Sequence, residues 1–182
     1  MLKAKPDAVV VATGATPIMP DGIPGVKRAN VAGALDILGN RALVGTRVVI
    51  VGGGLIGCET AEYLAEQGKR VTVVEMLDQL ACDLAPLLRK PLLDRLVKLG
   101  VNTEVRTKVT EIAANGVNAA QGGIRRWFET DTVVLAVGMA ARKGLAADLQ
   151  GKVQELHIAG DCAEPRKIVD AMSDGARVGF AV

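Results

Sequence analysis

The six residues 52–57 include glycines at a spacing that suits phosphate binding. They contain the pattern G-x-G-x-x-G and directly follow the β-branched run 48–51. In such a turn Gly52 permits the sharp reversal, Gly54 lets the backbone approach a pyrophosphate, and Gly57 lets a helix pack against the strand. The free N–H groups at the start of that helix then face the phosphates. We therefore expect the whole loop to bind a cofactor: Gly52, Gly53, Gly54, Leu55, Ile56 and Gly57.

An acidic residue completes this pattern at the end of the next strand. The apolar run 71–74 ends at Glu75, close to the ~20-residue distance at which the dinucleotide fingerprint places its acid. A carboxylate there accepts hydrogen bonds from the adenosine ribose and repels a 2′-phosphate, and no arginine follows at 76–78. The sequence predicts NAD(H) rather than NADP(H), with Glu75 and Met76 among the binding residues. A tight turn without a ligand is the alternative, but strand, loop, helix, strand and acid occur in the order that favours binding.

Two helices are expected around this site. Apolar residues at helical spacing predict a helix over 55–67, and Gly68 is a suitable C-terminal residue for it. A leucine stripe from 84 to 99 predicts a second helix, with Asp83 as its N-cap. Pro91 lies inside that stripe and is expected to kink or divide the helix, because proline removes a backbone donor.

The other elements are expected to be strands and loops. Residues 8–12 form a continuous apolar run, typical of a strand buried on both faces of a parallel sheet. The Pro- and Gly-rich segment 17–25 favours a linker between two sheets. Short strands are expected near 101–105, 108–113, 125–129 and 132–137, with turns at 115–116 and 122–123, as a meander that returns to the sheet.

Composition excludes several classes of function. With 182 residues and 49% hydrophobic content the chain can form a real core, yet no apolar run approaches the ~20 residues of a membrane span. The N-terminus has no leader-like apolar region, so a cytoplasmic location is the default. A net charge of +2 and 2% aromatic residues give no sign of a nucleic-acid surface.

Few side chains are available for metal or redox chemistry. Three dispersed cysteines form no C-x-x-C pair, and a single histidine leaves too few ligands for most metal sites. We interpret Cys58 and Cys162 as small buried packing residues and His157 as a structural strand residue. No catalytic side chain and no metal ligand is predicted.

Two strand ends are similar in kind, residues 7–14 and 131–138, since each apolar run ends in a small residue and glycine. With 157–161 (His-Ile-Ala-Gly-Asp), they make the chain resemble the pyridine nucleotide-disulfide oxidoreductase-like flavoproteins, whose FAD domain is split by an inserted NAD(P)H domain. Segment 7–14 resembles the A-T-G strand of that FAD domain, and Gly160-Asp161 its later G-D motif. The resemblance implies that FAD binds in the full-length protein, with Asp161 on the flavin ribityl chain. It adds these cofactor-binding candidates: Thr13, Gly14, Gly138, Gly160 and Asp161.

Residues 48–78 and 162–167 further resemble the C-terminal FAD/NAD(P)-binding region of old yellow enzyme-related NADH:flavin oxidoreductases, of the 2-enoate reductase, 2,4-dienoyl-CoA reductase and NADH oxidase type. This implies that hydride passes from NADH to FAD, and that electrons then pass on to an upstream 4Fe-4S cluster and FMN, to reduce an enoate or enoyl-type substrate. The partners implied are NADH and the FAD and FMN domains of the same polypeptide, with a possible homo-oligomer. The chain would then be a fragment that is inactive in isolation.

Several alternatives stay open. Glu59 resembles the family glutamate near the nicotinamide, but an exposed glutamate early in a helix also stabilises the helix dipole. The chain could instead be a non-catalytic ADP- or NAD-binding module, or part of a reductase that delivers electrons to a partner redox protein.

The expected fold is α/β: a Rossmann-like three-layer nucleotide-binding domain with a parallel sheet and an antiparallel β-meander, flanked by partial FAD-domain segments. The expected domains are 1–40 (FAD-type segment and linker), 41–150 (NAD(H)-binding domain) and 151–182 (return segment of the FAD-type domain).

Overall fold

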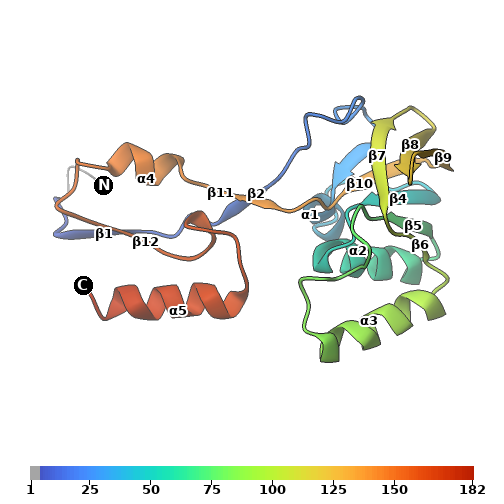
Figure 1. Cartoon of the computed structure of the whole chain (residues 1–182). Coiled ribbons are helices and arrows are strands. Elements are labelled where there is room, and N and C mark those ends of the chain that lie inside the picture. The colour runs from blue at the N-terminus through green and yellow to red at the C-terminus, as the bar shows by residue number, and fades with distance from the viewer. Residues whose placement is uncertain (1–4) are drawn as a thin grey trace. The chain divides into compact units, whose positions relative to one another are not determined.

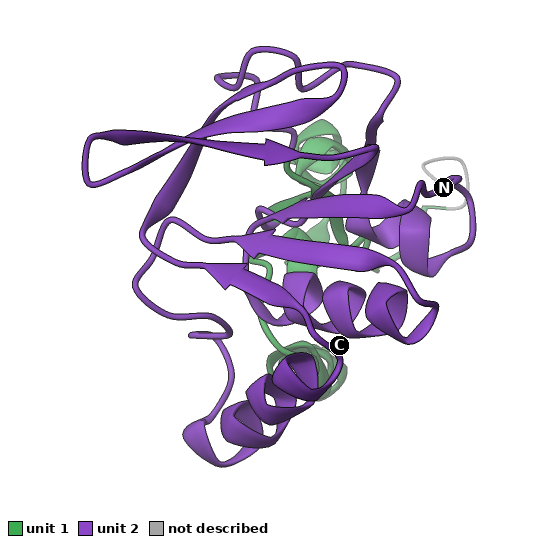
Figure 2. Cartoon of the chain, turned by 90° about the vertical axis from the view of Figure 1, so that its right-hand side faces the viewer, with its two compact units in different colours: residues 1–18, 139–182 green, residues 19–138 purple. Residues whose placement is uncertain are grey.

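The computed structural model describes residues 5–182, which form two compact units (Figures 1 and 2). Unit 1 combines Met1–Ile18 with Met139–Val182, and unit 2 is the continuous segment Met19–Gly138. Residues 1–4, which open the N-terminal stretch expected to lack a leader, lie outside the described part. The units divide the chain at 18/19 and 138/139, whereas the sequence placed boundaries near 40 and 150. Segment 31–33 joins the sheet of unit 2, which explains the first difference.

A five-stranded parallel sheet forms the centre of unit 2. Its strand order is β3 (Val31–Gly33), β10 (Thr132–Leu135), β4 (Arg47–Val51), β5 (Arg70–Val74) and β6 (Asn102–Glu104). In the register Val48 lies opposite both Val71 and Thr132, so β4 has a partner on each side. The two strands that frame the glycine loop, β4 and β5, are therefore adjacent and parallel, as dinucleotide binding requires.

Two different layers cover the faces of this sheet (Figure 1). Helices α1 (Ala34–Leu38), α2 (Leu55–Glu66) and α3 (Pro86–Lys98) lie on one face. An antiparallel sheet of β7 (Thr107–Ile112), β8 (Gly116–Gln121) and β9 (Ile124–Glu129) lies on the other.

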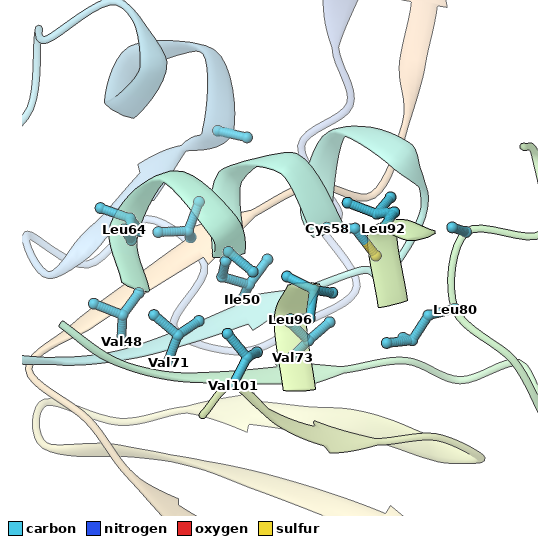
Figure 3. Close-up of a cluster of buried hydrophobic side chains, with 14 of the residues drawn as sticks. Val48, Ile50, Cys58, Leu64, Val71, Val73, Leu80, Leu92, Leu96 and Val101 are labelled. Atoms are coloured by element: carbon cyan, nitrogen blue, oxygen red, sulfur yellow. The ribbon is translucent and has the colours of Figure 1, made fainter. Parts of the chain in front are cut away.

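Alternating residues of β4 serve the two layers, because successive side chains of a strand point to opposite faces. Val48 and Ile50 pack with the helices, as Figure 3 shows, while Val49 and Val51 pack with the meander. The expected three-layer α/β fold with a parallel sheet and an antiparallel meander is confirmed.

The meander contains a strand that the sequence did not predict, β8. Strand β8 lies between the two expected turns, and it pairs with both β7 and β9. Its sequence, Gly-Val-Asn-Ala-Ala-Gln, has only one of the β-branched or aromatic residues that mark strands, Val117, so pairing on both sides determines its conformation. The strands near 101–105 and 132–137 belong to the parallel sheet instead, as β6 and β10.

The leucine-rich helix differs from the expectation at its N-cap, and it is continuous at Pro91. Its N-cap is Ala85, with no side-chain cap, and Asp83 lies before it. Pro91 does not divide the helix, which runs unbroken from Pro86 to Lys98. Pro91 is exposed, so the one missing donor leaves no buried group without a partner.

Unit 1 is smaller and is built from parts distant in sequence. Strands β1 (Ala8–Val11) and β12 (Glu155–Ile158) pair in parallel, and β2 (Ala15–Pro17) pairs antiparallel with β11 (Met139–Ala141). Helix α4 (Gly144–Leu149), the 3₁₀ turn η2 (Gly160–Cys162) and helix α5 (Ile168–Gly179) complete it.

The core of unit 1 is formed by five buried side chains: Val9, Val11, Ala146, Leu149 and Cys162. Strand β1 is not buried on both faces as expected, since Val10 between the two core valines is 46% exposed. One face of β1 packs inward, and the described part of the chain leaves the other open. No helix within residues 5–182 has the length and apolar character needed to cross a membrane.

Candidate functional site

The glycine loop lies between the end of β4 and the start of α2, as the sequence predicted. Gly52 has φ +101°, a backbone conformation that side chains rarely adopt, and a Cβ there would collide with the carbonyl of Ala136. A Cβ on Gly57 would collide with the Gly52 carbonyl. The first glycine is therefore required by its backbone conformation and by the Ala136 carbonyl, and the third by the close approach of α2 to the turn.

Gly54 has a different role. It is the N-cap of α2 in an extended conformation, φ −67° and ψ −176°, which any residue can adopt. A Cβ there would meet nothing closer than the Asp83 carboxylate, at 3.6 Å from Oδ2. The second glycine thus leaves an open approach in front of the helix N-terminus instead of relieving a clash.

Glu75 follows β5 directly and binds the loop through its carboxylate. Oε2 accepts a hydrogen bond of 2.6 Å from the Gly53 N–H, and Oε1 accepts one of 2.8 Å from the Leu77 N–H. The residue is 7% exposed. A carboxylate has about four acceptor positions, so two remain for hydroxyl groups of a ligand.

The segment 76–85 closes over the loop and is held to it by backbone contacts. The Ala81 N–H donates to the Gly53 carbonyl at 2.7 Å, and a Cβ on Gly53 would collide with the buried Leu80. Ala81 is itself buried, with the positive φ of +49°. Leu80 and Ala81 had not been identified from the sequence, where this stretch offers no periodic pattern.

Asp83 is another site residue that sequence reasoning missed. Its carboxylate accepts hydrogen bonds from the Leu55 N–H, at 3.0 Å to Oδ1 and 3.2 Å to Oδ2. Leu55 is the first residue of α2, so Asp83 caps this helix and not α3. A capping residue from a distant loop leaves no local spacing signal in the sequence.

The remaining predicted residues of unit 2 lie around this centre with different degrees of exposure. Ile56 lies in the first turn of α2, and Glu59 is exposed on the same helix. Met76 is 64% exposed on the segment after Glu75. Gly138 ends unit 2 with φ +108°, two residues beyond the Ala136 carbonyl that faces Gly52.

Cys58 lies beneath the loop as a buried packing residue, as predicted. Its thiol donates to the Gly53 carbonyl at 3.4 Å. Burial raises the pKa of Cys58 to about 12, and the nearby charge of Asp83 adds to the shift. The thiol therefore stays protonated at neutral pH and is a poor nucleophile, because the thiolate is the reactive form.

Most of the predicted residues of unit 1 line a cavity of about 560 Å³ between β1 and α5. Gly14, Gly160 and Asp161 all line it, together with Arg166 and Lys167. Thr13 is not among the lining residues, and its hydroxyl donates to the Arg142 carbonyl at 3.2 Å. The structure thus gathers three of the four candidates of this unit.

One hydrogen bond to α5 and one from the segment before it hold the Gly160-Asp161 turn. Gly160 has φ +68°, and its N–H donates to Asp174 Oδ2 at 3.1 Å. That hydrogen bond, with the charges of Arg177 and Arg166, lowers the pKa of Asp174 below its usual value. Asp161 Oδ1 accepts a hydrogen bond from the Arg166 N–H at 3.3 Å.

The other polar side chains give no sign of a metal centre. No three His, Cys, Asp or Glu side chains in the part of the chain that the structure describes gather as metal ligands would. His157 lies in β12, where Nε2 is 2.7 Å from Glu155 Oε1, consistent with a structural strand residue. Cys162 is buried, as predicted.

Comparison with known proteins gives consistent matches along the chain. The family model of pyridine nucleotide-disulphide oxidoreductases matches residues 2–175. An NADH oxidase of Thermoanaerobacter brockii is 38% identical over 97% of this chain and 28% of its own length. A metal reductase of Desulforamulus reducens is 36% identical over 93% of this chain and 30% of its own.

A solved structure matches over the whole chain. The 2-naphthoyl-CoA reductase in complex with 2-naphthoyl-CoA superimposes with a TM-score of 0.93 at 34% identity, covering 100% of this chain and 28% of that one. The chain thus spans less than a third of the length of each of these three relatives.

Proposed function

Because this chain belongs to the pyridine nucleotide-disulphide oxidoreductase family, we propose that unit 2 binds NADH for a flavin-dependent oxidoreductase. The resemblance to the FAD/NAD(P)-binding region of old yellow enzyme-related NADH:flavin oxidoreductases is confirmed by the NADH oxidase match and the naphthoyl-CoA reductase structure. The proposal assigns the binding to the loop 52–57 and to Glu75.

One observation carries the proposal: a glycine turn that exposes the N-terminus of α2 is tied to a buried acid at the end of β5. Gly54 leaves the space before the helix open except for the Asp83 carboxylate. Glu75 fixes the loop through Gly53 and keeps acceptor positions for the ribose hydroxyls. These residues fit the pyrophosphate and ribose of a dinucleotide.

Glu75 is assigned the choice of NADH over NADPH. Its carboxylate is buried, so a 2′-phosphate placed beside it would meet an unscreened negative charge. The next two residues, Met76 and Leu77, supply no cation to offset that repulsion. Glu59, on helix α2, is proposed to lie near the nicotinamide end of the bound cofactor.

Unit 1 is assigned to FAD in the full-length protein. Gly14, Gly160 and Asp161 line one cavity, and Asp161 is proposed to accept a hydrogen bond from the ribityl chain. The mostly apolar lining, from residues such as Val10 and Ala171, suits a flavin ring. When bound, FAD takes up the hydride of NADH and passes its electrons onward.

The side chains of this chain position the cofactors and tune their reactivity, and none acts as acid, base or nucleophile. For the full-length protein we propose onward transfer to an iron–sulfur cluster and FMN that reduce an enoate or enoyl-type substrate. The support is the name of the 2-naphthoyl-CoA reductase, whose substrate is also a conjugated acyl group.

The test is calorimetric titration of the chain with NADH, NADPH and ADP. NADH is expected to bind, with NADPH at least ~10-fold weaker, about 1.4 kcal/mol. Glu75→Gln should narrow this gap, whereas Glu66→Gln, which removes the same charge from the other end of α2, should leave it unchanged. Equal affinities for NADH and NADPH would contradict the role of Glu75. The absence of any binding would contradict the proposed function.

A further inference from the structure

The carboxylate of Asp83 lies where the proposed function places a phosphate. Both of its oxygens accept from the Leu55 N–H, and both lie within 3.7 Å of a Cβ built on Gly54. The space that the second glycine of the motif leaves open is thus filled by a negative side chain of the same protein. A carboxylate and a phosphate oxygen interact with a helix N-terminus in the same way, through N–H groups and the helix dipole.

We infer that Asp83 is a resident competitor of the dinucleotide, an affinity-determining carboxylate that the pyrophosphate displaces from the N-terminus of α2. The inference rests on the proposed function of unit 2 and adds a residue to it. Two anions cannot share the Leu55 N–H without strong repulsion, since unit charges 4 Å apart repel by ~1 kcal/mol even in water.

The surrounding segment is built so that the side chain can leave while the backbone stays. Leu80 and Ala81 are buried against Gly53 and hold the segment to the loop. Asp83, two residues further on, is exposed, so rotation about its side-chain bonds takes the carboxylate into solvent. Displacement therefore needs no unfolding of the segment 76–85.

The resident carboxylate also stabilises the ligand-free protein. It caps a helix whose N-cap is glycine and offers no side-chain acceptor. An aspartate cap stabilises a helix by satisfying a free N–H group and by its charge at the positive end of the dipole. Removal of the charge should therefore lower the stability of the free protein and raise the affinity for a diphosphate, two effects of opposite sign.

The experiment compares the unaltered chain with Asp83→Asn, which keeps the size and one acceptor oxygen. Calorimetric titrations with NADH and with ADP should show affinities at least ~5-fold higher for the variant, the factor that corresponds to a repulsion of ~1 kcal/mol. Titration with adenosine, which has no phosphate, should show no change. The melting temperature of the free variant should fall.

Asp78→Asn is the matched control, because it removes the same charge from the same segment. Asp78 is exposed, and its substitution should change neither ADP affinity nor melting temperature by a comparable amount. If the unaltered chain binds NADH and Asp83→Asn binds it equally or more weakly, Asp83 is a structural cap and the inference fails while the proposed function stands. If neither protein binds NADH or ADP, both fail.

Discussion

The two units differ in how completely their own residues enclose them. In unit 2 the central sheet is covered on both faces, and β4 contributes buried side chains to each layer. In unit 1 the core cluster has five buried side chains, from β1, α4 and η2, while Val10, Ile168 and Phe180 stay largely exposed. The same chain thus contains one closed layered fold and one open one.

This difference between the units bears on how firmly each unit holds its candidate site. A site on the closed unit, the loop 52–57, is held by backbone contacts from Ala136, β5 and the segment 76–85. The cavity at Gly160 and Asp161 is held mainly by one turn and α5, with apolar walls that face outward. We therefore expect unit 2 to be preorganised for its ligand and unit 1 to be less so.

The largest expected effect is the loss of core packing in unit 2. Ile50 is fully buried between β4 and the helices, so Ile50→Ala should lower the free energy of unfolding by about 2–5 kcal/mol. Val10→Ala, at a half-exposed position of unit 1, should cost less than ~0.5 kcal/mol. Urea denaturation of both variants checks the contrast, and equal losses would show that unit 1 is as closed as unit 2.

The next effect comes from the third glycine. Gly57→Ala puts a Cβ against the Gly52 carbonyl, and the helix must shift, at an expected cost of about 1–3 kcal/mol and with loss of NADH binding. Gly175→Ala, in α5 of unit 1, meets nothing within 4 Å and should be neutral or slightly stabilising. Thermal denaturation measures both, and a stable Gly57→Ala variant that binds NADH would refute the account of the turn.

A smaller and more selective effect is expected at the second glycine. Gly54→Ala meets only Asp83, at 3.6 Å, and its backbone conformation is open to alanine, so stability should change by less than ~0.5 kcal/mol. The methyl group would occupy the approach of the pyrophosphate, and NADH affinity should fall about 10-fold. Calorimetry and thermal denaturation together separate the two effects. Unchanged affinity would mean that phosphate binds elsewhere.

The last expected effect is absent at neutral pH and is confined to alkaline solution, where the stability of unit 2 should depend on pH. The pKa of Cys58 is raised from 9.0 to about 12 in the folded protein, so the unfolded chain loses this proton first as the pH rises. The stabilisation is complete below pH 9.0 and declines towards pH 12. Urea midpoints above pH ~9.5 should therefore fall less for Cys58→Ala than for the unaltered chain. An equal fall of the urea midpoint with pH for Cys58→Ala and the unaltered chain would contradict the burial effect.

The sequence predicted the parts of the fold that local patterns encode. The run 48–51, the three glycines and Gly68 mark a strand, a turn and a helix end, and the structure has each of them there. Strand β8 was missed because it has only one β-branched residue, Val117, among small and polar ones, and pairing with two neighbours imposes its conformation.

The candidate site was predictable to the same extent. Glycine spacing and the acid after β5 identify the loop 52–57 and Glu75, and the structure joins the two through the hydrogen bond from the Gly53 N–H to Glu75. The inward turn of Glu75 towards Gly53, and the position of Asp83 on Leu55, arise from the path of the segment 76–85. That path depends on the burial of Leu80 and on tertiary contacts, which no periodic pattern reports.

The most direct test of the account is to titrate NADH into residues 19–138 alone and into the whole chain under the same conditions. If unit 2 is closed and carries the dinucleotide site, the shorter protein should fold cooperatively and bind NADH within ~3-fold of the affinity of the whole chain, a difference below about 0.7 kcal/mol. If the whole chain binds NADH and residues 19–138 do not, the site depends on unit 1, and the central claim is contradicted.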